Sequence, residues 1–330
     1  MTTTTPRAPQ RADDDTEPVS RRRILLDTDL AMGASGSNID DGFALALAVA
    51  DPEIEVDLVT TVVGNTDVDT ATRLSRELLE RVGRSDIDVV RGAAAPLLGR
   101  PSRAATGPGT GPGRRHAATE IVERVLADPG ELTVVAIGPL TNVALALLLE
   151  PAIVAAVDEI VVMGGIFMQH TNDAARPGES NVSADPEAAN VVLRSGAPLR
   201  FVGLDVTRRV RLTGEHAVEM AGSARPFARF AGECALGWIE HKGRQHPGDP
   251  REQGSCALHD PLAVAVLTGP GLVSWSAAHV EVETAGRLTR GVCVADLLTS
   301  ADPPAANCEI ATDVDVDAFM STFLGRVGAL

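Results

Sequence analysis

One acidic stretch near the start of the chain limits what this sequence can fold into. The apolar run Ile24 to Leu26 stops at Asp27-Thr28-Asp29, and after a loop rich in Gly and Ser the pair Asp40-Asp41 precedes an apolar helical pattern. This order predicts a buried strand, a loop and a helix start, and ligands in open α/β sheets bind outside the carboxyl ends of the strands. Four carboxylates within fifteen residues would repel one another there unless a cation neutralises them. Oxygen ligands indicate a hard cation.

Three other interpretations of this stretch are open from the residues alone. Asp40 or Asp41 could only cap the helix, since Asp accepts bonds from N-terminal helix amides and suits the helix dipole. A dinucleotide site is disfavoured, because Gly33 and Gly36 do not belong to a G-x-G-x-x-G run. A phosphatase with the first Asp of D-x-D as nucleophile, as in haloacid dehalogenase-like enzymes, is a sharper alternative. That group usually has Thr or Val where this chain has Ala31.

The composition excludes several classes of function. The chain has 330 residues, of which 44% are hydrophobic, so it can bury a substantial core. Its formal net charge of -16 argues against nucleic acid as a partner, because phosphate binding depends on clustered Lys and Arg. No apolar run is long enough to span a membrane. A neutral or cationic small molecule is the expected ligand.

The N-terminal segment and the cysteines bear on location. Residues 1–22 lack the apolar segment of a signal peptide, and we expect a disordered tail there, ahead of a single domain over 23–330. The cysteines are far apart in the sequence and form no C-x-x-C pair: Cys234, Cys256, Cys293 and Cys308. They indicate neither a zinc site nor a disulfide framework, so the reducing cytoplasm is the expected compartment.

Apolar runs and helical patterns alternate through the first two-thirds of the chain. After the first strand, the predicted strands are Ile54 to Val63, Ile87 to Val90, Leu132 to Ile137, Ile160 to Met163 and Leu199 to Leu204. The helical patterns between them predict a mostly parallel, doubly wound α/β sheet with helices on both faces. Arg100 to Gly113 is expected to be a loop. Val280 to Ile310 should form short strands in hairpins before a C-terminal helix.

Polar residues stand at the ends of several of these strands. They are Asp27, Asp29, Asn65, the turn after Ile137, and Asp205. Because the carboxyl ends of parallel strands share one edge of a sheet, we expect a single crevice, which Glu179 to Asn181 and His259-Asp260 could also reach. Each residue has an ordinary explanation when taken alone: Asn65 as a turn residue, Asp260 as a helix cap and His259 as a hydrogen-bonded structural histidine.

In their order along the chain, these motifs resemble those of the inosine–uridine preferring nucleoside hydrolase family. The acidic positions of that family's opening Asp-x-Asp-Pro-Gly-x-Asp-Asp are matched by Asp27, Asp29, Asp40 and Asp41. The later matches are Val63-Gly64-Asn65, AIGPLTNVALAL from Ala136, MGG from Met163, Glu179-Ser180-Asn181, DPEAA from Asp185, GLDVT from Gly203 and LHDPLAVA from Leu258. The resemblance covers Arg23 to the C-terminus, and the ordered set is specific although each motif alone is weak.

The resemblance implies a role for each matching position. The calcium ligands would be the side chains of Asp29, Asp41 and Asp260 and the backbone carbonyl of Ile137. The substrate's ribose would contact Asp40, Asn65, Glu179, Asn181 and Asp260, with Glu179 and Asn181 near its 5′ side. Asp27 would support the metal loop, and Asp29 also matches the family's general base. His259 lies where some members have a His near the leaving base.

The implied chemistry agrees with these residue types. Breaking an N-ribosidic bond builds oxocarbenium character on the sugar, and nearby carboxylates stabilise that charge. A metal lowers the pKa of its bound water, so Asp29 can accept the proton. Protonation helps the base to leave, and His259 is the histidine beside the predicted metal site.

Two segments depart from the family pattern. Leu30 to Ile39 is a ten-residue loop where the family has Pro-Gly-x, and TGPGTGPG from Thr106 replaces a His-Gly-x-x-Gly-x-Gly segment that often follows the third strand. His116 aligns better with a later helix start. We expect the long loop to overhang the crevice and narrow the space for the leaving group, with Asn38 bonding backbone to close it. A harmless surface insertion is an equally open interpretation.

The sequence therefore predicts a calcium-dependent N-ribosyl hydrolase of a nucleoside or a close relative, in nucleoside salvage and as a homodimer or homotetramer. One alternative is a hydrolase or transferase of a modified ribosyl compound. Another is a non-catalytic ribose- or nucleoside-binding protein. Retention of Asp29, Asp40, Asp41 and Asp260 argues against that binding protein, because binding alone does not need a water-activating metal.

Overall fold

A computed structural model describes residues 21–330 except 35, 100–114, 170–171, 174–175 and 298–301. Strands and helices alternate first through β1 (Arg22–Thr28), α1 (Asp40–Ala50), β2 (Ile54–Thr61), α2 (Val68–Arg81), β3 (Val89–Arg91), α3 (Ala117–Ala127), β4 (Leu132–Ala136) and α4 (Thr141–Leu149). The middle of the chain holds α5 (Ile153–Ala156), β5 (Glu159–Met163), β6 (Asn172–Asp173), β7 (Arg176–Pro177), α6 (Ser180–Ala184), α7 (Pro186–Leu193), β8 (Leu199–Val202) and α8 (Leu204–Thr207). The remainder comprises β9 (Arg211–Thr213), α9 (Gly214–Ala221), α10 (Pro226–Gln245), the 3-10 turn η1 (Pro250–Glu252), β10 (Ser255–Ala257), α11 (His259–Ala265), β11 (Val273–Val282), β12 (Cys293–Asp296), β13 (Cys308–Val314) and α12 (Val316–Val327).

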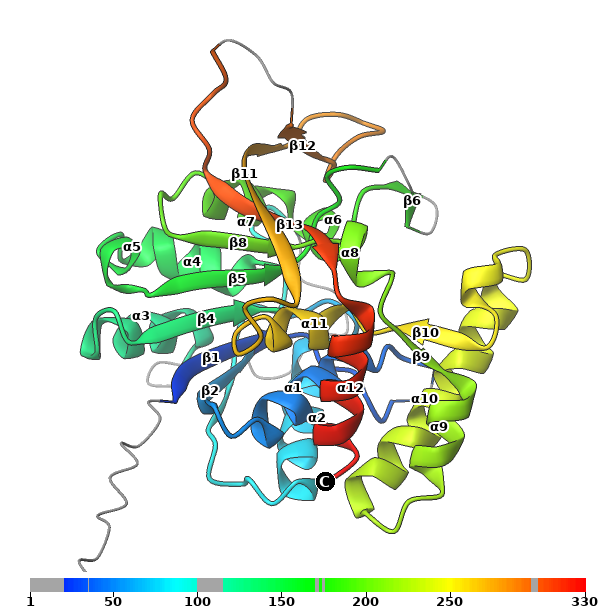
Figure 1. The fold of residues 1–330 in the computed structure, drawn as a ribbon. Coiled ribbons are helices and arrows are strands. Elements are labelled where there is room, and N and C mark those ends of the chain that lie inside the picture. Colours follow the sequence, from blue (N-terminus) through cyan, green and yellow to red (C-terminus); the bar gives the residue numbers. More distant parts are fainter. Residues whose placement is uncertain (1–20, 35, 100–114, 170–171, 174–175, 298–301) are drawn as a thin grey trace, which may run out of the picture.

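Nine strands of the described residues form one sheet (Figure 1) in the order β12-β11-β13-β8-β5-β4-β1-β2-β3. From β8 to β3 every neighbouring pair is parallel, as the strand-helix alternation predicts. The C-terminal strands agree in part with the expected short hairpins, since the consecutive strands β11 and β12 pair antiparallel. β11 is ten residues long and antiparallel to β13, while β13 pairs parallel with β8, so all three C-terminal strands extend the main sheet. Apolar patterning predicts strands, but not which edge they join.

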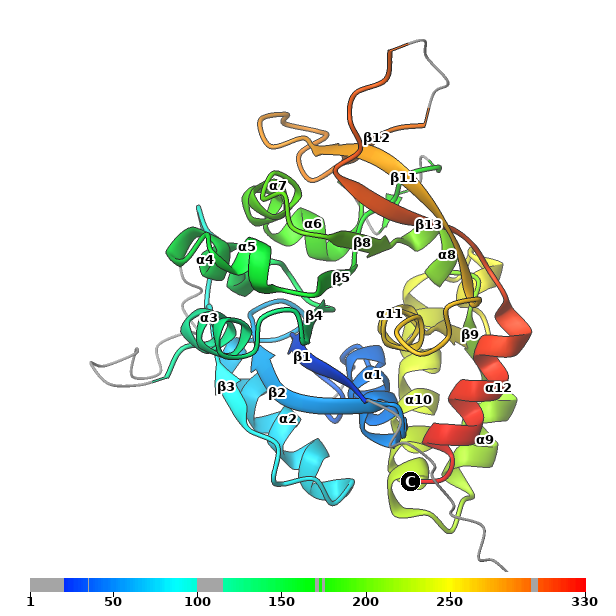
Figure 2. The ribbon, with the colours of Figure 1, turned by 60° about the vertical axis from the view of Figure 1, so that its left-hand side comes forward.

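Alternating residues of the strands face two separate cores. In β1, Ile24 and Leu26 pack into one core with residues of α1, α2, α10, α11 and α12, and Leu25 packs into the other with residues of α3, α4 and α7. Figure 2 shows α1, α10 and α12 on one side of the strands and α3 and α4 on the other. The doubly wound fold with helices on both faces is thus confirmed. The alternation follows from the period-two geometry of a strand.

The register brings the carboxyl ends of β1, β2 and β4 side by side. Asp27 pairs with Thr60 on β2 and with Ala136 on β4, and Thr28 pairs with Thr61. The residues after these strands therefore meet at one point of the sheet edge, where the functional site forms.

The N-terminal boundary differs slightly from the expected one. β1 begins at Arg22, inside the segment predicted as a tail, and the Arg22 backbone amide donates to the Glu53 carbonyl at 2.7 Å. Residues 1–20 of that predicted tail lie outside the described residues, as does the whole of the predicted loop from Arg100 to Gly113. Within the described part of the chain, no helix combines the length and the apolarity needed to cross a membrane.

Candidate active site

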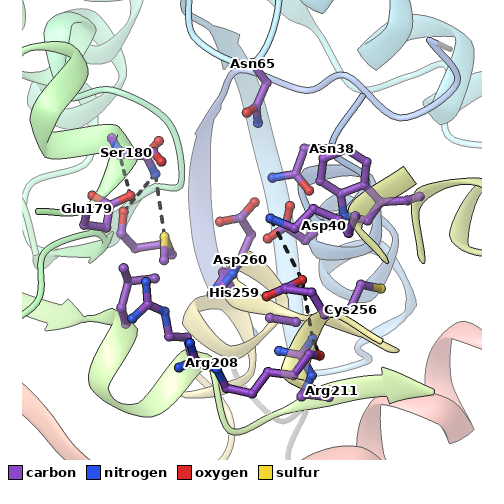
Figure 3. Close-up of a pocket in the computed structure, with 18 of the residues that line it drawn as sticks. Asn38, Asp40, Asn65, Glu179, Ser180, Arg208, Arg211, Cys256, His259 and Asp260 are labelled. Atoms are coloured by element: carbon purple, nitrogen blue, oxygen red, sulfur yellow. Dashed lines mark hydrogen bonds and ion pairs between the residues drawn. The ribbon is translucent and has the colours of Figure 1, made fainter. Parts of the chain in front are cut away.

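Four carboxylates, which we call the acidic floor, meet at this edge of the sheet: Asp29, Asp40, Asp41 and Asp260. Asp29 follows β1, Asp40 and Asp41 open α1, and Asp260 lies in the first turn of α11. Each is at most 4% exposed. Figure 3 shows Asp260 and His259 between Glu179 and Ser180 on one side of the pocket and Asn38 and Asp40 on the other. The residues predicted from strand ends and helix starts are therefore brought together.

Asn65 ties two of the floor carboxylates in place. Its backbone amide donates to Asp29 Oδ2 at 2.6 Å and its side-chain amide donates to Asp41 Oδ2 at 2.8 Å. Thr28 Oγ1 donates to the other oxygen of Asp41 at 2.6 Å. Gly64 makes this approach possible, because a Cβ there would lie 1.9 Å from Asp29 Oδ2. The Gly-Asn pair at the end of β2 is therefore a structural requirement of the floor.

Asp27 lies beneath the floor and supports it from the core. Its Oδ1 accepts bonds from Thr60 Oγ1 at 2.6 Å and from Asn142 Nδ2 at 2.8 Å. Asn142 also accepts from the Ala93 amide at 2.8 Å, so it links the ends of three strands. The sequence prediction missed Asn142. Its signal was a polar residue in the first turn of the otherwise apolar helix α4, directly after a strand end.

Burial makes these acids hard to ionise. It raises the pKa of Asp27 to about 7, and burial together with the charge of Asp41 raises the pKa of Asp40 to about 7. Burial and then the Asp41 charge also raise the pKa of Asp29 well above its usual range. Burial and then the charge of Asp40 also raise the pKa of Asp260 well above its usual range. A group of carboxylates with these shifts favours a bound cation.

The donor set fits a hard cation. Oxygens of Asp40, Asp41 and Asp260 all lie within 4.8 Å of one another, so one ion could contact all three carboxylates. Asp29 Oδ1 and Asp40 Oδ1 are buried and have no hydrogen-bond partner among the described residues. Buried oxygens without donors are costly unless a cation or water satisfies them. Oxygen-only donors of this kind suit Ca²⁺.

Asp40 does not cap α1, contrary to the simplest alternative interpretation. The N-cap is Ile39, and no side-chain cap hydrogen bond is present at this helix end. The Asp40 carboxylate instead accepts the backbone amides of Asp260 and His259, which lowers its pKa against the larger effect of burial. Asp40 thus holds α1 and α11 together across the pocket. Asp260 is not the N-cap of α11 either, since that position is Leu258.

Glu179 and Asn181 form the side of the pocket opposite Asp40. Glu179 caps α6 by accepting the amides of Asn181 and Val182 at 2.7 and 3.0 Å. Asn181 Nδ2 donates to the carbonyls of Ile137 and Met163 at 2.9 and 3.1 Å. The Ile137 carbonyl, a predicted metal ligand, therefore lies in the pocket wall with one lone pair engaged by Asn181.

His259 opens α11 and lines the pocket beside Asp260. Thr207 Oγ1 lies 2.8 Å from His259 Nδ1, which fixes the orientation of the imidazole ring. Thr207 is buried at the end of α8 and is the last residue of the Gly-Leu-Asp-Val-Thr motif. Asp205, expected at the crevice, accepts the amides of Phe167 and Met168 at 2.7 and 3.0 Å and has a structural role.

Helix α10, the turn after it and the segment from α8 to β9 also line the pocket, whose volume is about 210 Å³. The lining residues on this side are Arg208, Arg211, Trp238, Lys242, His246, Asp249, Arg251 and Glu252. Four of them, Arg211, Trp238, Lys242 and Glu252, are called the α10 wall below. The sequence prediction missed all four. Their signal was faint: Trp238 is one of two tryptophans in the chain, within a helical pattern that also carries Lys242.

The long loop from Leu30 to Ile39 is built differently from the expected overhang. Leu30 and Met32 are buried in the core, and Asn38 alone of the loop's described residues lines the pocket. Asn38 Oδ1 accepts the Ile39 amide at 2.9 Å, so the expected local closure is present. Gly36 has φ +72° and faces the His241 ring at 3.6 Å from its ideal Cβ position. The loop thus packs along α10 and contributes one side chain to the pocket.

The departure from the family pattern after the third strand, TGPGTGPG from Thr106, lies wholly outside the described residues. His116 is the N-cap of α3, and its Nδ1 accepts the Ala118 amide at 3.2 Å. The alignment of His116 with a later helix start is therefore confirmed. It lies in a structural position at the start of a helix.

Comparisons with known proteins agree with this architecture. A sequence model of the inosine-uridine preferring nucleoside hydrolase family matches residues 24–321. The non-specific ribonucleoside hydrolase RihC of Escherichia coli is 33% identical over 312 residues, covering 91% of this chain and 96% of that protein. The structure of a plant nucleoside hydrolase, PpNRh1, has a TM-score of 0.82 at 27% identity and covers 94% of this chain and 99% of its own. A purine-preferring ribonucleoside hydrolase from Gardnerella vaginalis has a TM-score of 0.80 at 28% identity, with coverages of 93% and 98%.

The fold and the acidic floor define an α/β enzyme with a buried group of carboxylates that could hold a metal ion. The chain belongs to the inosine-uridine preferring nucleoside hydrolase family, and it is an N-glycosyl hydrolase whose relatives act on ribonucleosides. The resemblance seen in the ordered motifs is thus confirmed. The phosphatase and the non-catalytic binding protein are excluded as alternatives.

Proposed function

We propose that this enzyme performs calcium-dependent hydrolysis of the N-glycosidic bond of a ribonucleoside, releasing ribose and the free base. The observation that carries the proposal is the acidic floor, in which buried carboxylate oxygens converge without enough donors to satisfy them. Asp29, Asp41 and Asp260, with the Ile137 carbonyl, would hold the ion, and Asp40 adds a further oxygen nearby. A bound Ca²⁺ would anchor the sugar hydroxyls and lower the pKa of water.

Asp29 is the proposed general base. Its raised pKa means that its carboxylate is a stronger proton acceptor than an exposed Asp. Asn65 holds Asp29 Oδ2 at 2.6 Å, which leaves Asp29 Oδ1 as the oxygen for water. The positive charge that develops on the ribose ring would be stabilised by the surrounding carboxylates.

The sugar would be held from both sides of the floor. Asp40 and Asn65 are placed to bind the 2′ and 3′ hydroxyls, and Glu179 and Asn181 to bind the 5′ side. All four line the same pocket, and Asp40, Glu179 and Asn181 are at most 9% exposed, which supports tight enclosure of a small polar group. His259, oriented by Thr207, is the proposed proton donor to the departing base.

Location and assembly are further parts of this proposal. The four cysteines are free, which fits the reducing cytoplasm. A homodimer or homotetramer is the assembly we expect. A hydrolase or transferase of a modified ribosyl compound is the alternative for the substrate, and it would use the same floor.

The proposal is tested by following base release from a panel of ribonucleosides and their 2′-deoxy counterparts by liquid chromatography. We expect ribonucleosides to be cleaved and deoxynucleosides to react at least about 10²-fold more slowly, because the missing hydroxyl leaves buried acceptors unpaired. Equal rates on both series would contradict the assignment of Asp40 and Asn65. Sugar transfer to an added alcohol in preference to water would favour the transferase alternative.

A further inference from the structure

Lys242 is a positively charged residue in the pocket that the proposed mechanism does not yet use. It lies on α10, its side chain is 23% exposed, and it lines the pocket that contains the acidic floor. Its Nζ is 3.9 Å from Glu252 Oε2, too far for a hydrogen bond. Within the described parts of the chain, this ammonium group donates no hydrogen bond. A mostly buried ammonium at a pocket surface favours an acceptor supplied by the ligand.

The same side chain lies over an aromatic ring. Lys242 Nζ is 5.7 Å from the centroid of the Trp238 ring, and Trp238 is the only Phe or Trp among the residues that line the pocket in the described structure. A planar base uses an aromatic face for contact. Trp238 already stacks on His241, with ring centroids 5.4 Å apart, so a base would contact the indole beside this stacked pair. A base placed there would come within reach of the Lys242 ammonium.

The charge of the α10 wall supports the same conclusion. Glu252 is shared by two cations, at 3.7 Å from Arg211 and 3.9 Å from Lys242. The four wall residues thus carry two positive charges and one negative charge, in a chain whose formal net charge is -16. A positive surplus in the pocket that the acidic floor also lines would stabilise negative charge on the part of a bound ligand that contacts the wall.

Arg211 is less able than Lys242 to supply this contact. Its guanidinium donates to Ser255 Oγ at 2.8 Å, to the Ser255 carbonyl at 3.2 Å and to the Arg251 carbonyl. These bonds hold Arg211 against the turn after α10. Lys242, with no such bonds and a flexible stem, can adjust to a ligand.

We propose that Lys242 binds a carbonyl oxygen of the base and stabilises the negative charge that the base acquires as it leaves, and that this contact selects oxo-bases such as uracil and hypoxanthine. The proposal rests on the nucleoside hydrolysis proposed above. The bond between C1′ and the ring nitrogen breaks, and its electron pair stays on the nitrogen and spreads to the carbonyl oxygens. One water molecule adds its OH group to C1′ and gives its remaining proton to Asp29. His259 donates one proton to the leaving base, so atoms and charge balance.

The test compares two leaving groups in the full-length enzyme with Ca²⁺ present. Lys242→Met removes the charge and keeps the apolar stem, and Lys242→Arg is the matched variant that keeps the charge. We expect Lys242→Met to lower kcat/KM for uridine by about 10²-fold, the range for losing one stabilising donor. The loss on 4-nitrophenyl riboside should be less than about threefold, because its leaving group is stable without help. Lys242→Arg should restore most of the uridine rate.

Each other outcome has a definite meaning. Equal losses on both substrates, or no loss on either, would overturn the role of Lys242. If Lys242→Met does not fold, Lys242→Gln is assayed with the same pair of substrates and the same criterion. A wild-type enzyme that cleaves 4-nitrophenyl riboside and uridine at normal rates, together with an unaffected Lys242→Met, rejects this inference and leaves the proposed function standing. A wild-type enzyme that cleaves neither rejects both.

Discussion

The acidic floor and the α10 wall contribute to the same pocket and are built in different ways. Floor residues are at most 4% exposed, and Asn65 and Thr28 hold two of them, Asp29 and Asp41, by hydrogen bonds of 2.6 to 2.8 Å. The charged wall residues approach one another only to 3.7 to 3.9 Å, on long side chains that are 17 to 23% exposed. A rigid floor would preserve the geometry that the proposed reaction needs, whereas Lys242 in the wall, which lacks the hydrogen bonds of Arg211, would adjust to the base in the proposal above.

The largest effect is expected from the proposed base in the floor. Asp29→Asn keeps the shape of the side chain and removes the proton acceptor, so kcat should fall by at least about 10²-fold. Asp249→Asn is the matched change of an acid beside the wall, and kcat should stay within about threefold of wild type. Steady-state kinetics on uridine measure both. A similar loss in the two variants would break the division between floor and wall.

Two Gly→Ala substitutions, one beside the floor and one on α10, test how much change in packing each region tolerates. Gly64→Ala places a Cβ 1.9 Å from Asp29 Oδ2, so Asp29 must move, and a displacement of this size lowers kcat by about 10²-fold. Gly237→Ala on α10 meets nothing within 4 Å and should raise the melting temperature, because Ala favours a helix over Gly by about 1 kcal/mol. Normal activity in Gly64→Ala would show that the floor tolerates movement.

The next variants test how assistance to the leaving group is divided between His259, beside the floor, and Lys242 in the wall. His259→Ala should slow uridine hydrolysis by about 10²-fold and 4-nitrophenyl riboside hydrolysis much less, because only the first leaving group needs a proton. In the double variant with Lys242→Met, losses that multiply would indicate separate roles. If His259→Ala slows both substrates equally, His259 only positions its neighbours, and His241 or His246 becomes the next candidate donor.

The smallest expected effect concerns how the stability of the folded state depends on pH. Asp27 and Asp40 have folded-state pKa values raised to about 7, so in chelator the native state binds more protons than the unfolded chain, and stability should fall as pH rises through about 7. Ca²⁺ should reduce this fall by compensating the ionised carboxylates. Melting temperatures at about pH 6.5 and about pH 8 measure it, a range above the lowered pKa of His116. Asp27→Asn should flatten the profile, and an unchanged slope would argue that Asp27 is already ionised.

The sequence indicated residues of the floor and the residues around it because they occupy positions with clear signals. Asp27, Asp29 and Asn65 end strands, and parallel strands must bring such ends together. His259 and Asp260 stand at the start of a helix, just before Pro261. The Pro and the apolar residues that follow it mark this helix start in the sequence. The order of these motifs along the chain was specific enough to indicate the family.

The wall could not be predicted in the same way. Lys242 lies on α10 and Glu252 in the turn after it, and neither belongs to the motifs that mark the floor in the sequence. Long charged side chains on a helix are usually solvated, so neither residue was expected in the pocket. The expected overhang of the crevice by the loop from Leu30 to Ile39 is not made by Leu30 or Met32, since these apolar residues are buried in the core. Asn142 was missed because its partners, Asp27 and Ala93, come from distant segments. Tertiary packing, which local patterns do not encode, decided these positions.

The central claim is that the acidic floor holds a Ca²⁺ ion needed to cleave a ribonucleoside. The most direct measurement is reducing-sugar release from uridine and inosine by the enzyme after chelator treatment and again after stepwise addition of Ca²⁺, alongside calorimetric Ca²⁺ binding to the wild type and to Asp260→Ala. The account predicts that release stops in chelator, returns in proportion to bound Ca²⁺, and is absent in Asp260→Ala together with high-affinity binding. Full sugar release by metal-free enzyme, or unchanged Ca²⁺ binding by Asp260→Ala, would contradict it.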